Sequence, residues 1–212
     1  MNLSASGVSA DKRYYENKEQ VSKPADFKID SYDLEFNFRN DLNAVATIKT
    51  DDVKDEYKFT LYHGYKISKI TDGNNDELNF TRDSDYLTIK NTSKSKLIKI
   101  YYHGSCDKYY SNYLSVFLPG NFAFYPIPGF NEMYSTHSYA GFDNLSLPYE
   151  TDFNVTVHSL KKVQCNLESS TNNEFKGKSD SLTLLSGFIN CVTINKTQIY
   201  YPYFNDAYNS DT

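Results

Sequence analysis

The chain has 212 residues, a net charge of −5 and an aromatic content of 16%, supplied by 20 Tyr and 14 Phe without any Trp. So many rings exclude an intrinsically disordered chain, because Tyr and Phe drive burial and favour pleated strands. The charges form no basic stripe and no apolar run reaches the roughly 18 residues of a membrane-spanning helix, so we expect neither nucleic-acid binding nor direct membrane insertion by this segment.

Residues 1–23 are predicted to be a tag remnant followed by a flexible or short helical lead-in. Residues 11–21 are charged and carry few strong apolar anchors, and Pro24 would end a helix there. The first twenty residues lack the apolar segment of a secretory signal peptide. Either the protein is cytosolic, or the sequence is an excised soluble piece of a protein whose targeting segment lies elsewhere.

Alternation of apolar and polar residues begins at Phe27 and predicts a series of short strands. Alternation at this spacing places one face of a strand on a core and the other in water. Turn signals separate the strands, for example residues 72–75 (Asp-Gly-Asn-Asn), since Gly and Asn tolerate positive φ. The strands expected in this first half are 27–38, 42–49, 57–62, 65–70, 78–80, 86–90 and 97–102.

The middle segment, residues 105–147, interrupts this pattern. It is rich in Tyr and Phe, and Pro and Gly punctuate residues 116–130, so we predict one long ordered loop packed by aromatic rings, without regular elements. Short strands with regular turn signals favour an all-β, antiparallel sandwich. It forms one domain over residues 24–203, and residues 204–212 are a polar tail that frays. The strands expected after the loop are 152–159, 163–167, 174–178, 181–189 and 198–203.

The sequence holds no complete set of groups for an enzyme chemistry. Its four histidines are too far apart for a local metal pair, and the HExxH motif, the nucleophile elbow and the phosphate-binding loop are absent from the sequence. A solvated loop is the default interpretation for His137, the histidine most worth following. We therefore predict a non-catalytic protein without a cofactor or a metal.

Three cysteines, Cys106, Cys165 and Cys191, are present without CxxC spacing, which disfavours a zinc site. Two interpretations stay open. All three are reduced, buried thiols, or one disulfide joins Cys165 to Cys191 across two neighbouring strands.

Six short motifs follow one another in an order that resembles a known family. They are residues 29–34 (IDSYDL), 97–104 (LIKIYYHG), 124–129 (FYPIPG), 153–157 (FNVTV), 164–167 (QCNL) and 184–188 (LLSGF). Together they resemble the N-terminal β-sandwich domain of M1-family zinc aminopeptidases, in the degenerate form found in bacterial membrane proteins of the ABC-2 permease type. The resemblance covers residues 27–190 and implies a saddle-like sandwich. In the family, the zinc ligands, the general-base glutamate and the GxMEN motif lie mostly in the following domain, so no catalytic residue is carried over.

The function expected from this resemblance is that of an extracytoplasmic domain of a bacterial membrane protein, associated with an ABC transporter. It would act by interaction or packing, with neighbouring domains or transmembrane helices of the parent protein as partners. The alternative is the N-terminal domain of an M1-type zinc aminopeptidase whose catalytic domain is missing here. A free sandwich that binds carbohydrate is a third reading, and it predicts a concave cluster of exposed rings.

An interaction surface is expected in the aromatic loop, and the opposing interpretation, weighed evenly with it, is that the rings line the core. The residues concerned are Tyr109, Tyr110, Tyr113, Phe122, Phe124, Tyr125, Tyr134, His137 and Tyr139.

Overall fold

The structure is a computed structural model that describes residues 11–106, 109–112, 114–134, 145–171, 173–195 and 197–202. A short helix over residues 11–16 precedes a long succession of strands. The strands are β1 (Ile29–Phe38), β2 (Leu42–Thr50), β3 (Glu56–Thr60), β4 (Tyr65–Asp72), β5 (Phe80–Asp83), β6 (Tyr86–Lys90), β7 (Leu97–Gly104), β8 (Tyr110–Asn112), β9 (Ser115–Leu118), β10 (Ile127–Pro128), β11 (Thr151–His158), β12 (Val163–Cys165), β13 (Glu168–Thr171), β14 (Glu174–Ser179), β15 (Leu184–Gly187), β16 (Ile189–Ile194) and β17 (Thr197–Pro202).

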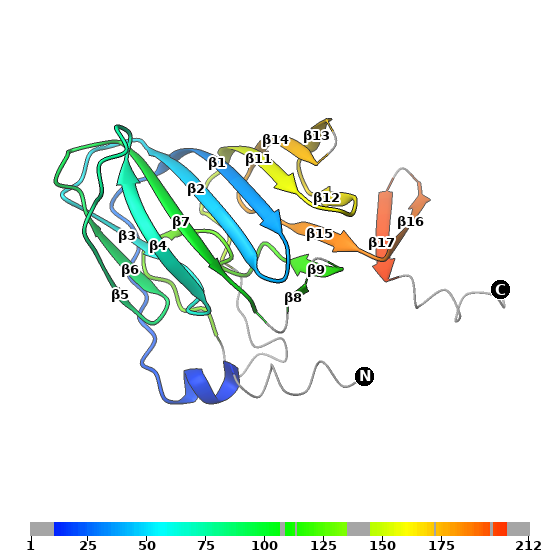
Figure 1. Cartoon of the computed structure of the whole chain (residues 1–212), viewed down its shortest axis with the longest axis horizontal. Coiled ribbons are helices and arrows are strands. Elements are labelled where there is room, and N and C mark those ends of the chain that lie inside the picture. The colour runs from blue at the N-terminus through cyan, green and yellow to red at the C-terminus, as the bar shows by residue number, and fades with distance from the viewer. Residues whose placement is uncertain are drawn as a thin grey trace.

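The largest sheet has seven strands in the order β13-β14-β11-β1-β2-β7-β4 and crosses the molecule as one layer (Figure 1). Tyr32, Leu34, Phe36 and Phe38 of β1 are buried, and the residues between them are exposed or half-exposed. This alternation follows from the period of two along a strand. A register shift in the β1–β2 pairing between Ile29 and Ser31 explains why the alternation changes phase at that point in the sequence.

Two four-stranded sheets complete the sandwich, in the orders β10-β3-β6-β5 and β12-β15-β9-β8. Their buried side chains join those of the large sheet in one core cluster. The fold class predicted from the sequence, an all-β sandwich, is thereby confirmed. One detail differs, because β1 pairs in parallel with β11. Strand direction is set by a pairing between segments far apart in the sequence, which local turn signals do not report.

The segment that leads to β10 runs through the core. Phe122, Phe124 and Tyr125 are fully buried there. The backbone carbonyls of such a segment need donors, because an unpaired polar group inside a core is costly. The Tyr32 hydroxyl of β1 donates to the Pro126 carbonyl at 2.8 Å, and the Tyr102 hydroxyl of β7 donates to the Phe124 carbonyl at 2.8 Å. At these two positions Tyr therefore stabilises the core better than Phe, because its ring fills space and its hydroxyl donates a hydrogen bond to a loop carbonyl.

The observed strands correct the sequence prediction in the middle segment and after residue 167, where β13 was not expected. The middle segment was expected to lack regular elements, but it contains β8, β9 and β10. These strands are only two to four residues long. β9 pairs with β15, which comes much later in the chain. The predicted strand over residues 181–189 is shorter, because β15 ends at Gly187 and β16 begins a separate pairing at Ile189.

The lead-in takes the helical form at residues 11–16, and Tyr15 on this helix belongs to the core. Residues 17–23 continue along the sandwich, and Lys23 forms an isolated antiparallel bridge with Phe130. The expected tag remnant at residues 1–9 and the tail at residues 204–212 lie outside the described residues.

Candidate functional site

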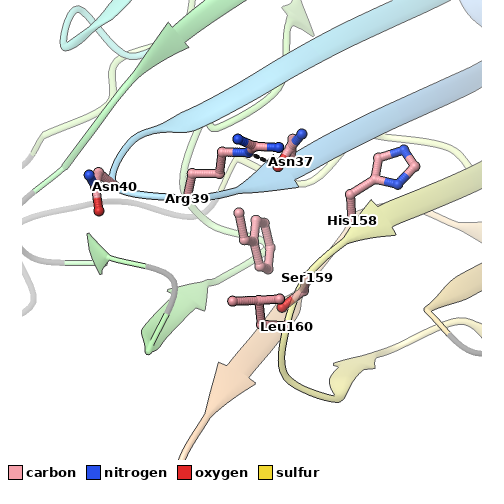
Figure 2. Close-up of a pocket in the computed structure, with 7 residues that line it drawn as sticks. Asn37, Arg39, Asn40, His158, Ser159 and Leu160 are labelled. Carbon is pink, nitrogen blue, oxygen red and sulfur yellow. Dashed lines mark hydrogen bonds between the residues drawn. The ribbon is translucent and has the colours of Figure 1, made fainter.

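A cavity of about 750 Å³ opens where the parallel strands β1 and β11 end (Figure 2). After β1 the chain turns directly into its neighbour β2, whereas after β11 it leaves for β12 in another sheet. Connections that diverge from the carboxyl ends of adjacent parallel strands leave a crevice, which is a frequent place for ligands in open sheets. The crevice is lined by Asn37, Phe38, Arg39, Asn40, His158, Ser159 and Leu160.

The polar groups of this crevice are held by their neighbours. Arg39 Nε donates to Asn37 Oδ1 at 3.1 Å, as the dashed line in Figure 2 marks. His158 Nε2 lies 2.8 Å from Glu35 Oε1 on the exposed face of the sheet. Ser159 Oγ accepts a hydrogen bond from the Lys161 amide at 3.1 Å. Serine and histidine therefore have separate partners and are not arranged as nucleophile and base.

An apolar side chain completes the crevice on one side. Leu160 is 83% exposed, and Phe38, which also lines the crevice, is buried. A guanidinium group, an imidazole and two amides beside an exposed leucine can bind a carboxylate or an amide by hydrogen bonds. The chemistry of the crevice is therefore that of binding, and neither Arg39 nor Leu160 was singled out from the sequence. No local motif marks them, because the strand pairing creates the crevice.

A second hollow of about 420 Å³ lies on the open face of the large sheet, against Tyr101 of β7. The ammonium of Lys69 sits 4.6 Å from the centre of the Tyr101 ring and covers it. The carbohydrate-binding reading predicts a concave cluster of exposed rings. Among the described residues this hollow offers one half-exposed ring with a lysine over it, so it does not favour that reading.

The predicted interaction residues are buried wherever the structure describes them. All six described rings belong to the core cluster, and Tyr110, Phe122, Phe124 and Tyr125 have no exposed area. Burial raises the pKa of the Tyr109 hydroxyl to about 12, as expected for a phenol withdrawn from water. These six rings therefore line the core, because removing an aromatic ring from water into a packed interior is more favourable than leaving it exposed. An interaction role for the loop remains a prediction. These six rings do not support it, because they are buried. Tyr113, His137 and Tyr139 lie outside the described residues.

None of Cys106, Cys165 and Cys191, all of which the structure describes, forms a disulfide. Cys106 is buried, Cys165 is half-buried and Cys191 is exposed, so the expectation of three buried thiols is correct for one of them. Cys165 lies in β12, next to β15, whereas Cys191 lies in β16, next to β17. The predicted pairing required neighbouring strands, and these two strands are not neighbours.

The two-stranded sheet β16–β17, which we call the arm, stands at one side of the sandwich (Figure 1). Val192 of β16 pairs directly with Ile199 of β17, and Ile194 follows two residues after Val192 on the same face. All three side chains are between 42% and 53% exposed. A two-stranded hairpin alone is only marginally stable in water, and an uncovered β-branched face marks a surface for a partner. The sequence predicted a strand at 198–203 but not this uncovered face.

The resembled family uses zinc. In the part of the chain that the structure describes, no three His, Cys, Asp or Glu side chains come together as ligands. The described residues therefore offer no ligand set for a zinc ion. No helix of the described ranges is long and apolar enough to cross a membrane.

No protein-family model matches the sequence, and neither does any curated protein. Solved structures match in fold. Yeast LTA4 hydrolase in complex with bestatin superposes with a TM-score of 0.56 at 14% identity, over 93% of this chain and 35% of that one. An aminopeptidase N family protein from Idiomarina loihiensis superposes with a TM-score of 0.53 at 11% identity, over 80% of this chain and 32% of that one.

The fold is that of an M1 aminopeptidase N-terminal domain. At the level of the fold, this supports the resemblance that we inferred from the six motifs. The chain spans about a third of the length of these two proteins. The narrower ABC-2 permease context stays a prediction.

Proposed function

We propose that the chain is a non-catalytic β-sandwich domain that works by packing against a neighbouring domain of a longer polypeptide, and that the arm is the contact. The observation that carries this proposal is the uncovered apolar face formed by Val192, Ile194 and Ile199. Residues 189–202 contain a single charged residue in the sequence, Lys196. Charge depletion with exposed apolar groups is the composition of an interface core.

The neighbouring domain is favoured as the occupant because of the solved structures that share this fold. In both, a region like this chain makes up only about a third of the protein, so the fold occurs together with further domains. A second copy of the chain is the competing occupant, and the experiment below separates the two.

The parent protein that we propose is a bacterial membrane protein associated with an ABC transporter, with this domain on the extracytoplasmic face. The support is the order of the six motifs. The competing proposal is that the parent protein is an M1-type zinc aminopeptidase. The similarity in fold to the solved structures supports both parents equally. A parent reading frame with HExxH and a further downstream glutamate would decide for the peptidase. Membrane-spanning segments on either side of the chain would decide for the membrane protein.

The arm contact is tested by hydrogen exchange of the amides in residues 189–202, in this chain and in the parent polypeptide. We expect fast exchange in the chain alone and at least tenfold slower exchange in the parent, because a docked sheet opens less often. Val192→Thr with Ile199→Thr should remove that protection. Leu160→Thr is the matched control, since it changes an exposed apolar residue outside the arm and should leave the protection intact.

Two results would overturn the arm contact. Equal exchange rates in the chain and in the parent would show that nothing covers the arm. Protection that rises with the concentration of the isolated chain, accompanied by a dimer in light scattering, would assign the face to a second copy.

A further inference from the structure

The crevice at the ends of β1 and β11 contains an arginine whose charge has no counterpart within the domain. The guanidinium of Arg39 is oriented by one hydrogen bond, from its Nε atom to Asn37 Oδ1 at 3.1 Å. Within the described residues its two terminal amino groups make no hydrogen bond and no ion pair. Arg39 is exposed, so these groups form a fixed fork of donors that a ligand can reach.

The carboxylates next to Arg39 in the sequence do not occupy this fork. Glu35 Oε1 lies 2.8 Å from His158 Nε2 and is held there. Asp41 contacts Arg39 through the backbone, where the Asp41 carbonyl accepts from the Arg39 amide at 3.4 Å. Neither carboxylate forms an ion pair with Arg39. The guanidinium therefore presents its positive charge to the crevice.

The shape of this cation favours one class of anion. A guanidinium is planar, and two of its N–H groups match the two oxygens of a carboxylate. A lysine at the same place would act as a point charge and would not select a planar anion. Arg39 therefore favours a carboxylate that approaches in the plane of the fork.

An exposed apolar side chain lines the same crevice. Leu160 lies in the loop after β11 and is 83% exposed, the largest value among the large apolar side chains that the structure describes. Figure 2 shows Arg39 and Asn37 at the end of β1, His158 at the end of β11 and Leu160 in the loop beyond it. A ligand with an apolar group can cover Leu160 and remove apolar area from water, which an inorganic anion cannot do.

Neutral polar groups of the crevice complement a peptide bond. The side-chain amide of Asn40 has no hydrogen bond within the described residues, and it offers both a donor and an acceptor. The Ser159 hydroxyl accepts from the Lys161 amide at 3.1 Å and keeps its own proton to donate. The crevice thus combines partners for a carboxylate, a peptide bond and an apolar side chain. The last residue of a peptide chain carries all three, whereas a fatty acid lacks the peptide bond.

We propose that the crevice binds the C-terminal residue of a peptide whose last side chain is apolar. Arg39 binds the terminal carboxylate, Asn40 and Ser159 bind the last peptide bond, and Leu160 packs against the side chain. The site uses no residue of the arm, so it is independent of the proposed packing role.

The experiment is an NMR titration of the isotope-labelled full chain that follows the backbone amides of residues 37–40 and 158–160. N-acetyl-leucine carries all three groups. N-acetyl-leucinamide lacks the charge, N-acetylglycine lacks the apolar side chain and isocaproate lacks the peptide bond. We expect millimolar binding of N-acetyl-leucine, about tenfold weaker binding of the amide and roughly threefold weaker binding of the other two probes.

Two variants assign these preferences to their residues. Arg39→Gln should lose the preference for N-acetyl-leucine over its amide, because it removes the charged fork. Arg13→Gln is the matched control, since it changes an exposed arginine on the N-terminal helix, and it should keep that preference. Leu160→Thr should keep the preference for the acid but lose the preference for leucine over glycine.

Four results would overturn the proposal. The first is no change in these amides with N-acetyl-leucine, and the second is an acid preference that persists in Arg39→Gln. Sodium acetate that binds as tightly as N-acetyl-leucine would reduce the site to a contact for any small carboxylate. Isocaproate that binds as tightly would assign the crevice to fatty acids.

Discussion

The sandwich and the arm are made of the same kind of strand, but they differ in what lies against their apolar faces. In β1 the alternate apolar side chains are buried by the opposing sheets. In β16 Val192 and Ile194 alternate in the same way, yet both are exposed. Alternation therefore predicts that a strand has an apolar face, but it does not predict what covers that face. An apolar face that is covered by another sheet stabilises this domain, whereas an uncovered apolar face is available to another domain.

The two regions also differ in how they treat polar groups. In the sandwich, tyrosine hydroxyls from β1 and β7 reach the carbonyls of the buried loop. In the arm, the β16 side chains from Cys191 to Ile194 are exposed, and the two strands are joined by their own backbone pairing. Substitutions in the two regions should therefore differ in their cost to stability.

The largest effect is expected from truncating a ring of the core. Phe36→Ala should lower the free energy of unfolding by about 3–5 kcal/mol, because it removes buried apolar area and leaves a cavity. Phe188→Ala, at a half-exposed ring, should change it by less than about 0.5 kcal/mol. Urea denaturation of both variants measures the difference, and equal effects would contradict the division between covered and uncovered faces.

A large kinetic contrast is expected between the thiols of the two regions. Burial raises the pKa of Cys165 to about 11, so at pH 8 only about one part in a thousand of this thiol is the reactive thiolate. Cys191 is exposed in the arm and should react with an alkylating reagent at least about a hundredfold faster. Mass spectrometry of a labelling time course measures both rates. Two thiols that resist labelling until reduction would instead revive the disulfide.

A smaller loss is expected when a core hydroxyl is removed without changing the ring. Tyr32→Phe leaves the Pro126 carbonyl without its donor and should cost about 1–2 kcal/mol of stability. Tyr101→Phe is the matched control on the open face of the same sheet, where water replaces any lost contact. Thermal and urea unfolding should separate the two variants. Indistinguishable stabilities would show that the loop does not depend on tyrosine donors.

The smallest effect on stability is expected in the arm. Val192→Thr with Ile199→Thr should change the unfolding free energy of the sandwich by less than about 0.5 kcal/mol, because neither side chain joins the core. The same variant should bind less of a dye that fluoresces on apolar surface, since it removes two exposed β-branched groups. A loss above about 1 kcal/mol would mean that the arm packs on the sandwich and belongs to its core.

Much of the fold follows from local pattern. The alternation from Phe27 onward gives most strands to within a few residues, and the phase change at Ser31 corresponds to an observed register shift. The short strands β8, β9 and β10 could not be predicted in this way. β9 and β10 are held by pairing with distant segments, and β8 pairs with β9 at the end of the same sheet. Two to four residues are also too few for a periodic signal.

The candidate sites follow from local pattern to a much smaller degree. Arg39 and His158 are separated by most of the chain and meet because β1 and β11 pair in parallel. The aromatic loop was the most visible feature of the sequence, but ring content by itself does not distinguish a core from a surface.

The sequence alone determined that this protein is an all-β sandwich of alternating strands with an ordered aromatic segment. These properties follow from residues within a few positions of one another. Only the tertiary structure decided that the six described rings expected to form an interaction surface line the core, that one strand pair is parallel and that the arm is left uncovered. Burial is a relation between surfaces that the chain brings together from distant positions, so the periodicity of a single strand cannot contain it.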